Sequence, residues 1–186
     1  MRHVMIDLET LGTSQSAAIA AIGAVEFNPR GGELGPAFYC HVDIEDAVAA
    51  GLKIEPNTVK WWLRQGEESR AELARPRRPL PLSQALHRLA IFLAGNDNTV
   101  DTKGELVVWA KGTSFDCAIL RTAYDLVGSD LPWNFWNERC YRTIARLVPA
   151  IAEPEFDGVA HNALEDAKHQ AQHLQMILGS APVEAL

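Results

Sequence analysis

The most constraining feature of the sequence is a short apolar run that leads directly into two acidic residues near the start of the chain. Val4, Met5 and Ile6 precede Asp7, and Glu9 follows two positions later. Such a run favours a buried strand, although periodicity alone leaves a helix open. Side chains alternate across a strand, so Asp7 and Glu9 are expected on the same face. Two neighbouring carboxylates in a buried setting repel each other unless water or a divalent cation reaches them. Taken alone, the pair is more simply a polar strand end in contact with water.

Length and composition indicate one ordinary globular domain covering residues 1–186. The chain has 47% hydrophobic and 22% charged residues, which is typical of such domains. No apolar run approaches the roughly 20 residues of a membrane-spanning helix, and the N-terminus lacks a signal-peptide pattern, so no membrane partner is expected. Three cysteines without a Cys-x-x-Cys pair favour a reducing, cytoplasmic compartment: Cys40, Cys117 and Cys140.

The charge of the chain narrows the function classes. A net charge of −7 argues against a protein that coats duplex nucleic acid electrostatically. Arginines nevertheless gather in two groups, the first being Arg64, Arg70, Arg75, Arg77 and Arg78, and the second Arg139, Arg142 and Arg146. The acidic total therefore leaves a nucleic-acid substrate open.

Apolar and turn patterns predict an α/β fold with a mixed sheet. Strands expected at residues 19–27 and 36–42 would join the first strand in an antiparallel meander, and a buried strand is expected at residues 106–110. Gly23 indicates either a close backbone approach or a bulge. Helices are expected at residues 55–65, after an N-cap at Ser83, from Ser114, within residues 140–148 after a short strand, and at residues 163–178. Loops are expected at residues 75–81 and 95–103.

Two further acids fall at expected helix starts. Asp116 follows the strand at residues 106–110; an acid there complements the helix dipole, but the same junction is where ligands of α/β proteins bind. The spacing of Asn162 and Glu165 predicts an N-cap and a helix that begins at residue 163, with Asp166 in its first turns. His161 precedes the cap and is expected on a loop free to swing.

In this order, Asp7-Leu8-Glu9-Thr10, Ser114-Phe115-Asp116 and His161-Asn162-Ala163-Leu164-Glu165-Asp166-Ala167 resemble the three motifs of the DEDDh superfamily of 3′-to-5′ exonucleases, which have a ribonuclease H-like fold. The resemblance covers about residues 3–178. Within the superfamily the chain is most similar to the small exodeoxyribonuclease VIII-like exonucleases of phages and bacteria, on the residues Trp61-Trp62-Leu63-Arg64-Gln65 and Arg142-Thr143.

The resemblance implies a two-metal site. Asp7, Glu9, Asp116 and Asp166 would bind two Mg²⁺ or Mn²⁺ ions, and His161 would act as general base. Hard divalent cations prefer oxygen ligands, and a pair of them can clamp the attacking and leaving oxygens of a phosphoryl displacement. A histidine ordinarily titrates near 6.5, so it can accept a proton at neutral pH.

Substrate contacts are implied at the turn that follows the first strand. By the resemblance Thr10, Leu11 and Gly12 would hold the terminal nucleotide; the plain alternative is a strand-to-loop turn. Aromatic side chains stack on the bases of single strands, which makes Trp61 and Trp62 candidates. Neighbouring helix positions point about 100° apart, so at least one of the two belongs to the core. The core is favoured for Trp62, and both roles stay open for Trp61.

We therefore expect a two-metal-dependent 3′-5′ exonuclease that hydrolyses single-stranded nucleic acid with a free 3′ end to nucleoside 5′-monophosphates. RNA and DNA stay open as substrates, and so does a homodimer. A ribonuclease H-type endonuclease would need the acids but not His161. A catalytically silent nuclease-fold binding or scaffold protein would not need all five residues. A two-carboxylate glycosidase would leave Asp116, Asp166 and His161 unused.

Overall fold

The structure is a computed structural model that describes residues 1–74, 76, 78–95 and 104–180. Arg75 and Arg77 of the first arginine group, and residues 96–103 of a predicted loop, lie outside the described residues. Among the described helices, none is long and apolar enough to cross a membrane. In chain order the elements are β1 (Arg2–Thr10), β2 (Ile19–Phe27), β3 (Ala37–His41), α1 (Ile44–Ala49), α2 (Pro56–Trp62), α3 (Glu67–Ala74), α4 (Leu82–Ala94), β4 (Leu106–Ala110), α5 (Asp116–Leu126), the 3₁₀ turn η2 (Phe135–Asn137), β5 (Glu138–Cys140), α6 (Tyr141–Leu147) and α7 (Ala163–Gly179).

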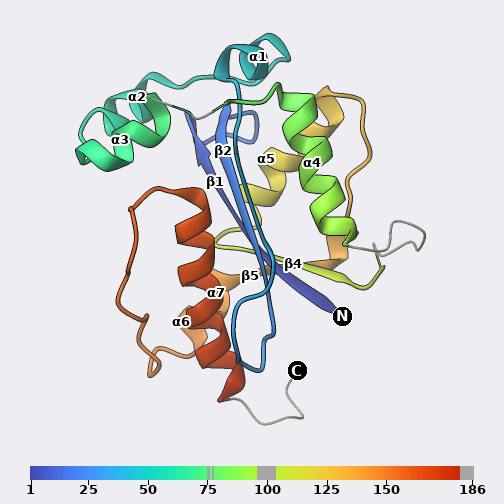
Figure 1. The fold of residues 1–186 in the computed structure, drawn as a ribbon, viewed down its shortest axis with the longest axis vertical. Coiled ribbons are helices and arrows are strands. Elements are labelled where there is room, and N and C mark those ends of the chain that lie inside the picture. The colour runs from blue at the N-terminus through green and yellow to red at the C-terminus, as the bar shows by residue number, and fades with distance from the viewer. Residues whose placement is uncertain (75, 77, 96–103, 181–186) are drawn as a thin grey trace.

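A five-stranded mixed sheet forms the centre of the fold, with the strand order β3-β2-β1-β4-β5. The pairs β1–β2 and β2–β3 are antiparallel, whereas β1–β4 and β4–β5 are parallel. Helix α7 covers one face, α4 and α5 cover the other, and α1 to α3 lie at the end where β1 finishes (Figure 1). The predicted antiparallel meander, continued by parallel strands, is confirmed.

Strand β1 alternates between two hydrophobic clusters on opposite faces of the sheet. Val4, Ile6 and Leu8 belong to the larger cluster, which includes side chains of α4 and α5. Met5 belongs to a smaller cluster with residues of α7 and α6. Because Asp7 has the same parity as Met5, it faces α7, and so does Glu9. The predicted alternation is confirmed and sets the direction of both carboxylates.

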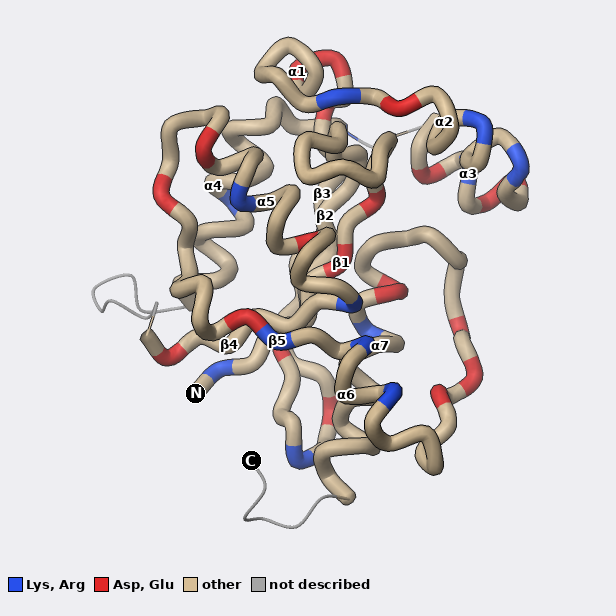
Figure 2. Tube along the Cα trace, turned by 180° about the vertical axis from the view of Figure 1, so that it is seen from behind, with Lys and Arg blue, Asp and Glu red and all other residues tan. Residues whose placement is uncertain are grey.

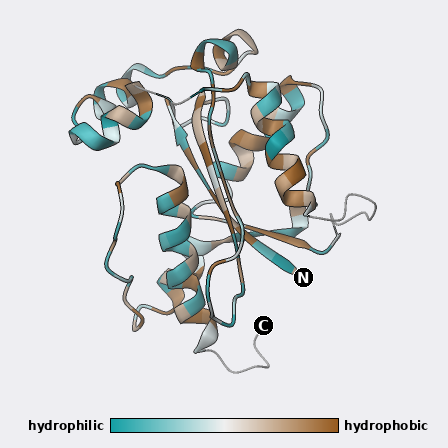
Figure 3. Cartoon of the chain, in the orientation of Figure 1, coloured by the Kyte–Doolittle hydropathy of each residue, from teal (hydrophilic) through white to brown (hydrophobic). Residues whose placement is uncertain are grey.

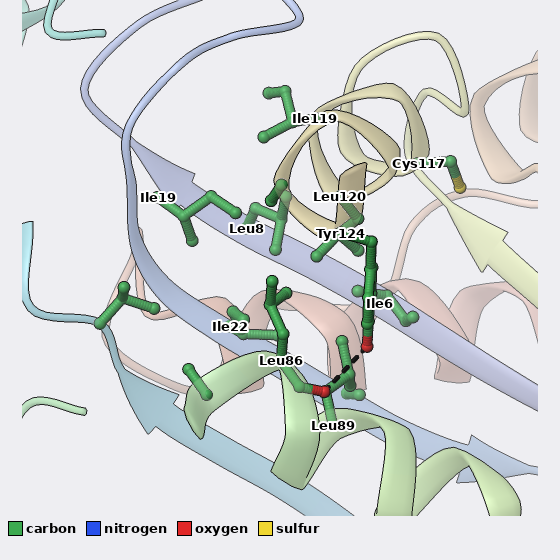
Figure 4. Close-up of a cluster of buried hydrophobic side chains, with 14 of the residues drawn as sticks. Ile6, Leu8, Ile19, Ile22, Leu86, Leu89, Cys117, Ile119, Leu120 and Tyr124 are labelled. Carbon is green, nitrogen blue, oxygen red and sulfur yellow. Dashed lines mark hydrogen bonds between the residues drawn. The ribbon is translucent and has the colours of Figure 1, made fainter. Parts of the chain in front are cut away.

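The larger cluster fixes the two helices behind β1. Leu86 and Leu89 of α4 and Leu120 of α5 are at most 1% exposed. The buried Tyr124 hydroxyl donates a hydrogen bond to the Leu86 carbonyl at 2.9 Å, which ties α5 to α4 (Figure 4). Hydropathy follows the same layering, since the central strands are largely hydrophobic while α3 is largely hydrophilic (Figure 3). The start of α5 is therefore held firmly beside the end of β1.

Gly23 lets α7 approach the sheet more closely than any other residue would. A Cβ atom at Gly23 would lie 2.2 Å from the carbonyl carbon of Ala163, the first residue of α7. The predicted close backbone approach at Gly23 is confirmed. The irregularity in strand pairing falls elsewhere, between Glu9 and Thr10. The missing side chain brings the beginning of α7 down onto β2, next to the face that carries the two β1 acids.

The helix starts agree only in part with the sequence analysis. Asn162 caps α7 as predicted, and its side chain accepts hydrogen bonds from two backbone N–H groups of the first turn. The predicted N-cap at Ser83 is wrong, because α4 begins at Leu82, whose N–H donates to the Asp46 carboxylate at 2.7 Å. Helix α5 begins at Asp116 rather than near Ser114. Helix α2 ends at Trp62, three residues before the predicted end, and the sequence analysis missed α1 and α3.

Candidate active site

The four predicted acids come from three elements that meet at the end of β1. Asp7 and Glu9 lie on β1, Asp116 is the first residue of α5, and Asp166 is in the first turn of α7. Acidic positions gather near the end of β1 (Figure 2). One ligand atom each of Glu9, His161 and Asp166 lies within 4.8 Å of the others. Asp7 and Asp116 adjoin this group, since each of these carboxylates raises the pKa of Glu9.

The capped start of α7 positions Asp166 and His161 together. The Asp166 backbone N–H donates to the carbonyl of Asn162 at 2.9 Å, in the helical pattern. In return the Asp166 carboxylate accepts the backbone N–H of His161 at 3.0 Å. His161 has a φ of 65°, in the left-handed region that few residues other than glycine adopt. The carboxylate therefore stabilises an unusual backbone turn that brings the imidazole to the acids.

Aromatic rings hold the His161 side chain in place. Its imidazole meets the ring of Trp61 edge-to-face with 4.8 Å between centroids, and that of Trp62 with 5.8 Å. The preceding residue, Ala160, accepts a hydrogen bond from the Ser69 hydroxyl of α3 at 2.7 Å. The predicted loop position of His161 before α7 is confirmed, and in the structure contacts from α2 and α3 hold this segment, so its freedom to swing stays a prediction. These helices are remote in sequence, so local spacing could not reveal the contacts.

Burial raises the pKa of all four acids, and repulsion by neighbouring acids raises those of Asp7 and Glu9 further. Burial raises the pKa of Glu9 to about 9, with further increases from Asp7 and Asp166. Burial raises the pKa of Asp116 to about 7, although backbone hydrogen bonds oppose the rise. The pKa of Asp7 is raised well above its ordinary value by burial and then by Asp116, and that of Asp166 is raised by burial. The metal-free site therefore retains protons at neutral pH and is poised to exchange them for cations.

The stability of the metal-free protein should fall as the pH rises from about 5 to 9. The Glu9 carboxyl, with an ordinary pKa of 4.5, titrates at about 9 when folded, and that of Asp116 moves from 3.8 to about 7. The folded state thus holds protons that the unfolded chain has released, and each group loses its contribution as the pH rises through its folded value. Thermal unfolding in EDTA at several pH values measures this trend. Glu9→Gln should flatten it, and a melting temperature that rises across this window would contradict the assignment.

A pocket of about 450 Å³ opens beside the acids. It is lined by Leu8, Glu9, Thr10, Gly12, Thr13, Glu55, Asn57, Thr58, Trp61, Trp62 and Phe115. Three of the four predicted substrate-contacting residues, Thr10, Gly12 and Trp61, are therefore on its wall. The fourth, Leu11, is 5% exposed and lies in the hydrophobic core, so its contact with substrate stays a prediction.

The two tryptophans of α2 have different environments. Trp62 is 3% exposed, and its indole N–H donates to the Thr10 carbonyl at 2.9 Å, which confirms the predicted core position. Trp61 is 41% exposed and adjoins both the pocket and His161. Trp61 is therefore the more exposed of the two tryptophans and is partly accessible from the pocket.

Gln170 is a site residue that the sequence analysis missed. Its side-chain amide is 2% exposed and donates to the Asp7 carboxylate at 2.8 Å. Among the buried side-chain polar atoms of the described residues, its carbonyl oxygen has no hydrogen-bond partner. Gln170 follows Asp166 by four positions, the spacing that places two residues on one helix face, so the sequence did contain a signal for it.

The donor set fits hard divalent cations. Four carboxylates supply oxygen ligands, and their raised pKa values show that their charges are not balanced by the protein alone. The unpartnered oxygen of Gln170 adds an acceptor beside Asp7 that a bound water could satisfy. Asp7, Glu9, Asp116 and Asp166 are thus suited to hold Mg²⁺ or Mn²⁺.

A second, larger cavity of about 880 Å³ lies at the β3 edge and contains none of the predicted site residues. Its lining includes Tyr39, His41 and Glu72, which are joined by short contacts: the Tyr39 hydroxyl donates to Glu72 at 2.6 Å and lies 3.2 Å from His41. The Asn162 amide also reaches the Tyr39 hydroxyl at 3.4 Å. This group supports the α7 cap from behind.

Solved structures share this architecture. The nuclease domain of 3′hExo, a DEDDh family member bound to rAMP, matches with a TM-score of 0.57 at 14% sequence identity, over 95% of this chain and 91% of that chain. The zinc-bound form of the E. coli ExoI–ssDNA complex matches with a TM-score of 0.56 at 15% identity, over 95% of this chain and 39% of that one. The predicted ribonuclease H-like fold is therefore confirmed.

Sequence comparison agrees with the structural comparison. The exodeoxyribonuclease of Enterobacteria phage T4 is 26% identical over 202 residues, which covers 89% of this chain and 84% of that protein. Family model and shared fold together define an exonuclease, as predicted, and its structural neighbours include a member of the DEDDh family. The chain belongs to the 3′-5′ exoribonuclease Rv2179c-like domain family, whose sequence model matches residues 2–178.

Proposed function

We propose that this exonuclease uses two divalent cations, Mg²⁺ or Mn²⁺, to hydrolyse single-stranded nucleic acid from a free 3′ end into nucleoside 5′-monophosphates. The observation that carries the proposal is the meeting of four raised-pKa carboxylates and His161 beside a pocket lined by Thr10, Gly12 and Trp61. In the proposed site Asp7, Glu9, Asp116 and Asp166 hold the cations. The family description supports the direction of degradation.

The chemistry is an in-line hydrolysis of the last phosphodiester. When bound, the two cations supply positive charge at the attacking and leaving oxygens of the displacement. His161, which Trp61 and Trp62 hold in place, accepts the proton of the attacking water. The water oxygen bonds to phosphorus while the bond from phosphorus to the 3′ oxygen of the preceding nucleotide breaks. That oxygen gains a proton, leaving a new 3′-hydroxyl end and a nucleoside 5′-monophosphate.

We infer that the pocket holds the end of a strand. Its lining includes Glu9 and four residues of α2, and its volume of about 450 Å³ suits a terminal nucleoside. The partly exposed ring of Trp61 is proposed to stack on the terminal base without reading its identity. The carboxylates next to the pocket would then surround the phosphate of that nucleotide.

Single strands labelled at the 5′ end should shorten as a ladder from the 3′ end in Mg²⁺ and stay intact in EDTA. A terminal 3′-phosphate should slow the reaction strongly, because it adds bulk and charge where the terminal hydroxyl lies. Duplex ends should be cut more slowly, since separating terminal bases costs a few kcal/mol. Gel electrophoresis of the labelled strands measures each effect.

A circular single strand of the same sequence is the matched control. It offers every internal phosphodiester but no end, so it should survive. Efficient cutting of the circle would replace this proposal with the endonuclease. Assays with RNA and DNA strands of the same sequence decide the sugar preference. The family is described as an exoribonuclease, whereas the phage relative is named an exodeoxyribonuclease.

A further inference from the structure

Two basic side chains lie near the acids and outside the lining of the pocket. Lys111 directly follows β4, and because Ala110 pairs with Ile6 in the parallel ladder, Lys111 lies alongside Asp7. Arg142 is in the first turn of α6, two residues beyond the end of β5. Lys111 and Arg142 thus follow the ends of β4 and β5, two strands that run in the direction of β1, at the end of the sheet where the carboxylates lie. Basic positions gather between β5, α6 and α7 (Figure 2).

Arg142 reaches across to the start of α5. Its guanidinium nitrogen Nη1 lies 3.6 Å from the place that a Cβ atom on Gly112 would occupy, and Phe115 lies 3.9 Å from the same point. The Gly112 carbonyl accepts the backbone N–H of Asp116 at 3.1 Å, so Arg142 lies over the turn that presents this carboxylate. Phe115 also lines the pocket, whereas Lys111 and Arg142 do not. Arg142 therefore lies beside the turn before α5, next to both Phe115 at the pocket wall and the start of α5 that carries Asp116.

The charged groups of Lys111 and Arg142 are not engaged in holding the described part of the fold together. Both side chains are exposed, and within the described part of the chain neither the Lys111 ammonium nor the Arg142 guanidinium forms an ion pair or donates a hydrogen bond. Their charges do reach the site, since Lys111 lowers the pKa of Asp7 and Arg142 that of Asp116. An unpaired lysine and arginine beside a nucleic-acid site are typical phosphate ligands.

We propose that Lys111 and Arg142 form a subsite for the phosphate of the nucleotide immediately 5′ of the one released. This inference rests on the proposed function, which puts the terminal nucleoside in the pocket and its phosphate at the acids. The strand then continues from the acids toward the preceding nucleotide, and Lys111 and Arg142 are basic side chains next to these acids that lie outside the pocket. The arginine fork suits bidentate contact with phosphate oxygens, and the lysine adds a point charge.

Matched dinucleotides test the subsite directly. A dinucleotide with a 5′-hydroxyl contains only the phosphate that reacts, whereas the same dinucleotide with a 5′-phosphate adds one group at the proposed position. The wild-type protein should turn over the phosphorylated form with a kcat/KM about tenfold higher, as expected for a charged hydrogen bond. Lys111→Ala and Arg142→Ala should each reduce that preference several-fold and the double variant should abolish it, because each loses more turnover of the 5′-phosphorylated form than of the 5′-hydroxyl form.

A control variant and a salt titration complete the experiment. Arg139→Ala removes an equal positive charge nearby and is the control. The Arg139 guanidinium already donates hydrogen bonds to the carbonyls of Trp136 and Glu138, so its loss should leave the preference for the 5′-phosphate unchanged. On longer strands each lost phosphate contact should reduce the slope of log KM against log salt by about 0.7. Melting temperatures verify that every variant is folded.

The outcomes separate the subsite from the proposed function. An equal loss of kcat/KM on both dinucleotides in the variants would mean that Lys111 and Arg142 act on the reacting phosphate or only balance the charge of the acids. The proposed subsite would then be wrong. A wild-type protein that does not distinguish the two dinucleotides overturns it as well. If the wild-type protein degrades neither dinucleotides nor longer strands, the proposed function itself fails, and the subsite fails with it.

Discussion

Asp7→Asn and Asp166→Asn should each lower the rate of strand shortening by about 10³-fold or more, because each removes a charge placed to stabilise the displacement. Both side chains have other partners in the structure: Asp7 accepts a hydrogen bond from Gln170, and Asp166 accepts one from the backbone of His161. An asparagine oxygen can accept the same hydrogen bonds, so the substitutions should remove charge while preserving geometry. Single-turnover rates at saturating Mg²⁺ measure the effect.

Stability measurements distinguish loss of chemistry from loss of fold. Without metal, either variant should be as stable as the wild type or more so, since one member of a repelling group is gone. The stabilisation that Mg²⁺ gives the wild-type protein should shrink in the variants, because less of it binds the folded state. Glu45→Gln neutralises an exposed acid of α1 and is the matched control for charge. Full activity in either aspartate variant would remove the two-metal proposal.

His161→Ala should lower the rate by roughly 10²–10⁴-fold, the usual contribution of general base catalysis. The acidic limb of the pH–rate profile should flatten in the variant, because the group that must lose its proton is gone. His161→Asn is a useful second variant, since asparagine tolerates the positive φ at this position better than alanine does. His87→Ala removes an exposed imidazole from α4 and is the control.

The same variants decide between two roles for His161. Its ring nitrogen lies near enough to Glu9 and Asp166 to act as a metal ligand instead of a base. A general base can be lost with little change in metal affinity, whereas loss of a ligand weakens binding of the metal. Calorimetric titration with Mn²⁺ therefore accompanies the kinetics. A wild-type pH profile in His161→Ala would show that the attacking water ionises without this side chain.

The parts of the site that could be predicted from the sequence depend on local rules. Strand alternation determined that Asp7 and Glu9 share a face, and the side chain of Asn162 determined where α7 begins. Both rules act within a few residues, so they hold before the rest of the chain is considered. The resemblance to known motifs supplied the order in which acids from distant segments would meet, which no local rule contains.

The parts that could not be predicted depend on contacts between remote segments. Helix α4 begins at Leu82 because its N–H finds Asp46, thirty-six residues earlier, and no local pattern reveals that partner. The contacts that hold His161 come from Trp61 of α2 and from Ser69 of α3. Ser69 donates a hydrogen bond to the carbonyl of Ala160, ninety-one residues later in the chain. Helix α3 is short and largely hydrophilic, so it lacks the apolar periodicity by which helices are recognised.

Gly23 shapes the candidate active site although it supplies no side chain to it. Gly23 sits on β2, a strand that provides none of the acids, yet the backbone of Ala163 rests where its side chain would be. Any larger residue would push the first turn of α7 outward and carry Asp166 and His161 away from Glu9. The geometry of the site thus depends partly on the lack of a side chain at Gly23. A search limited to reactive side chains would miss this position, although it determines how closely Asp166 and His161 approach Glu9.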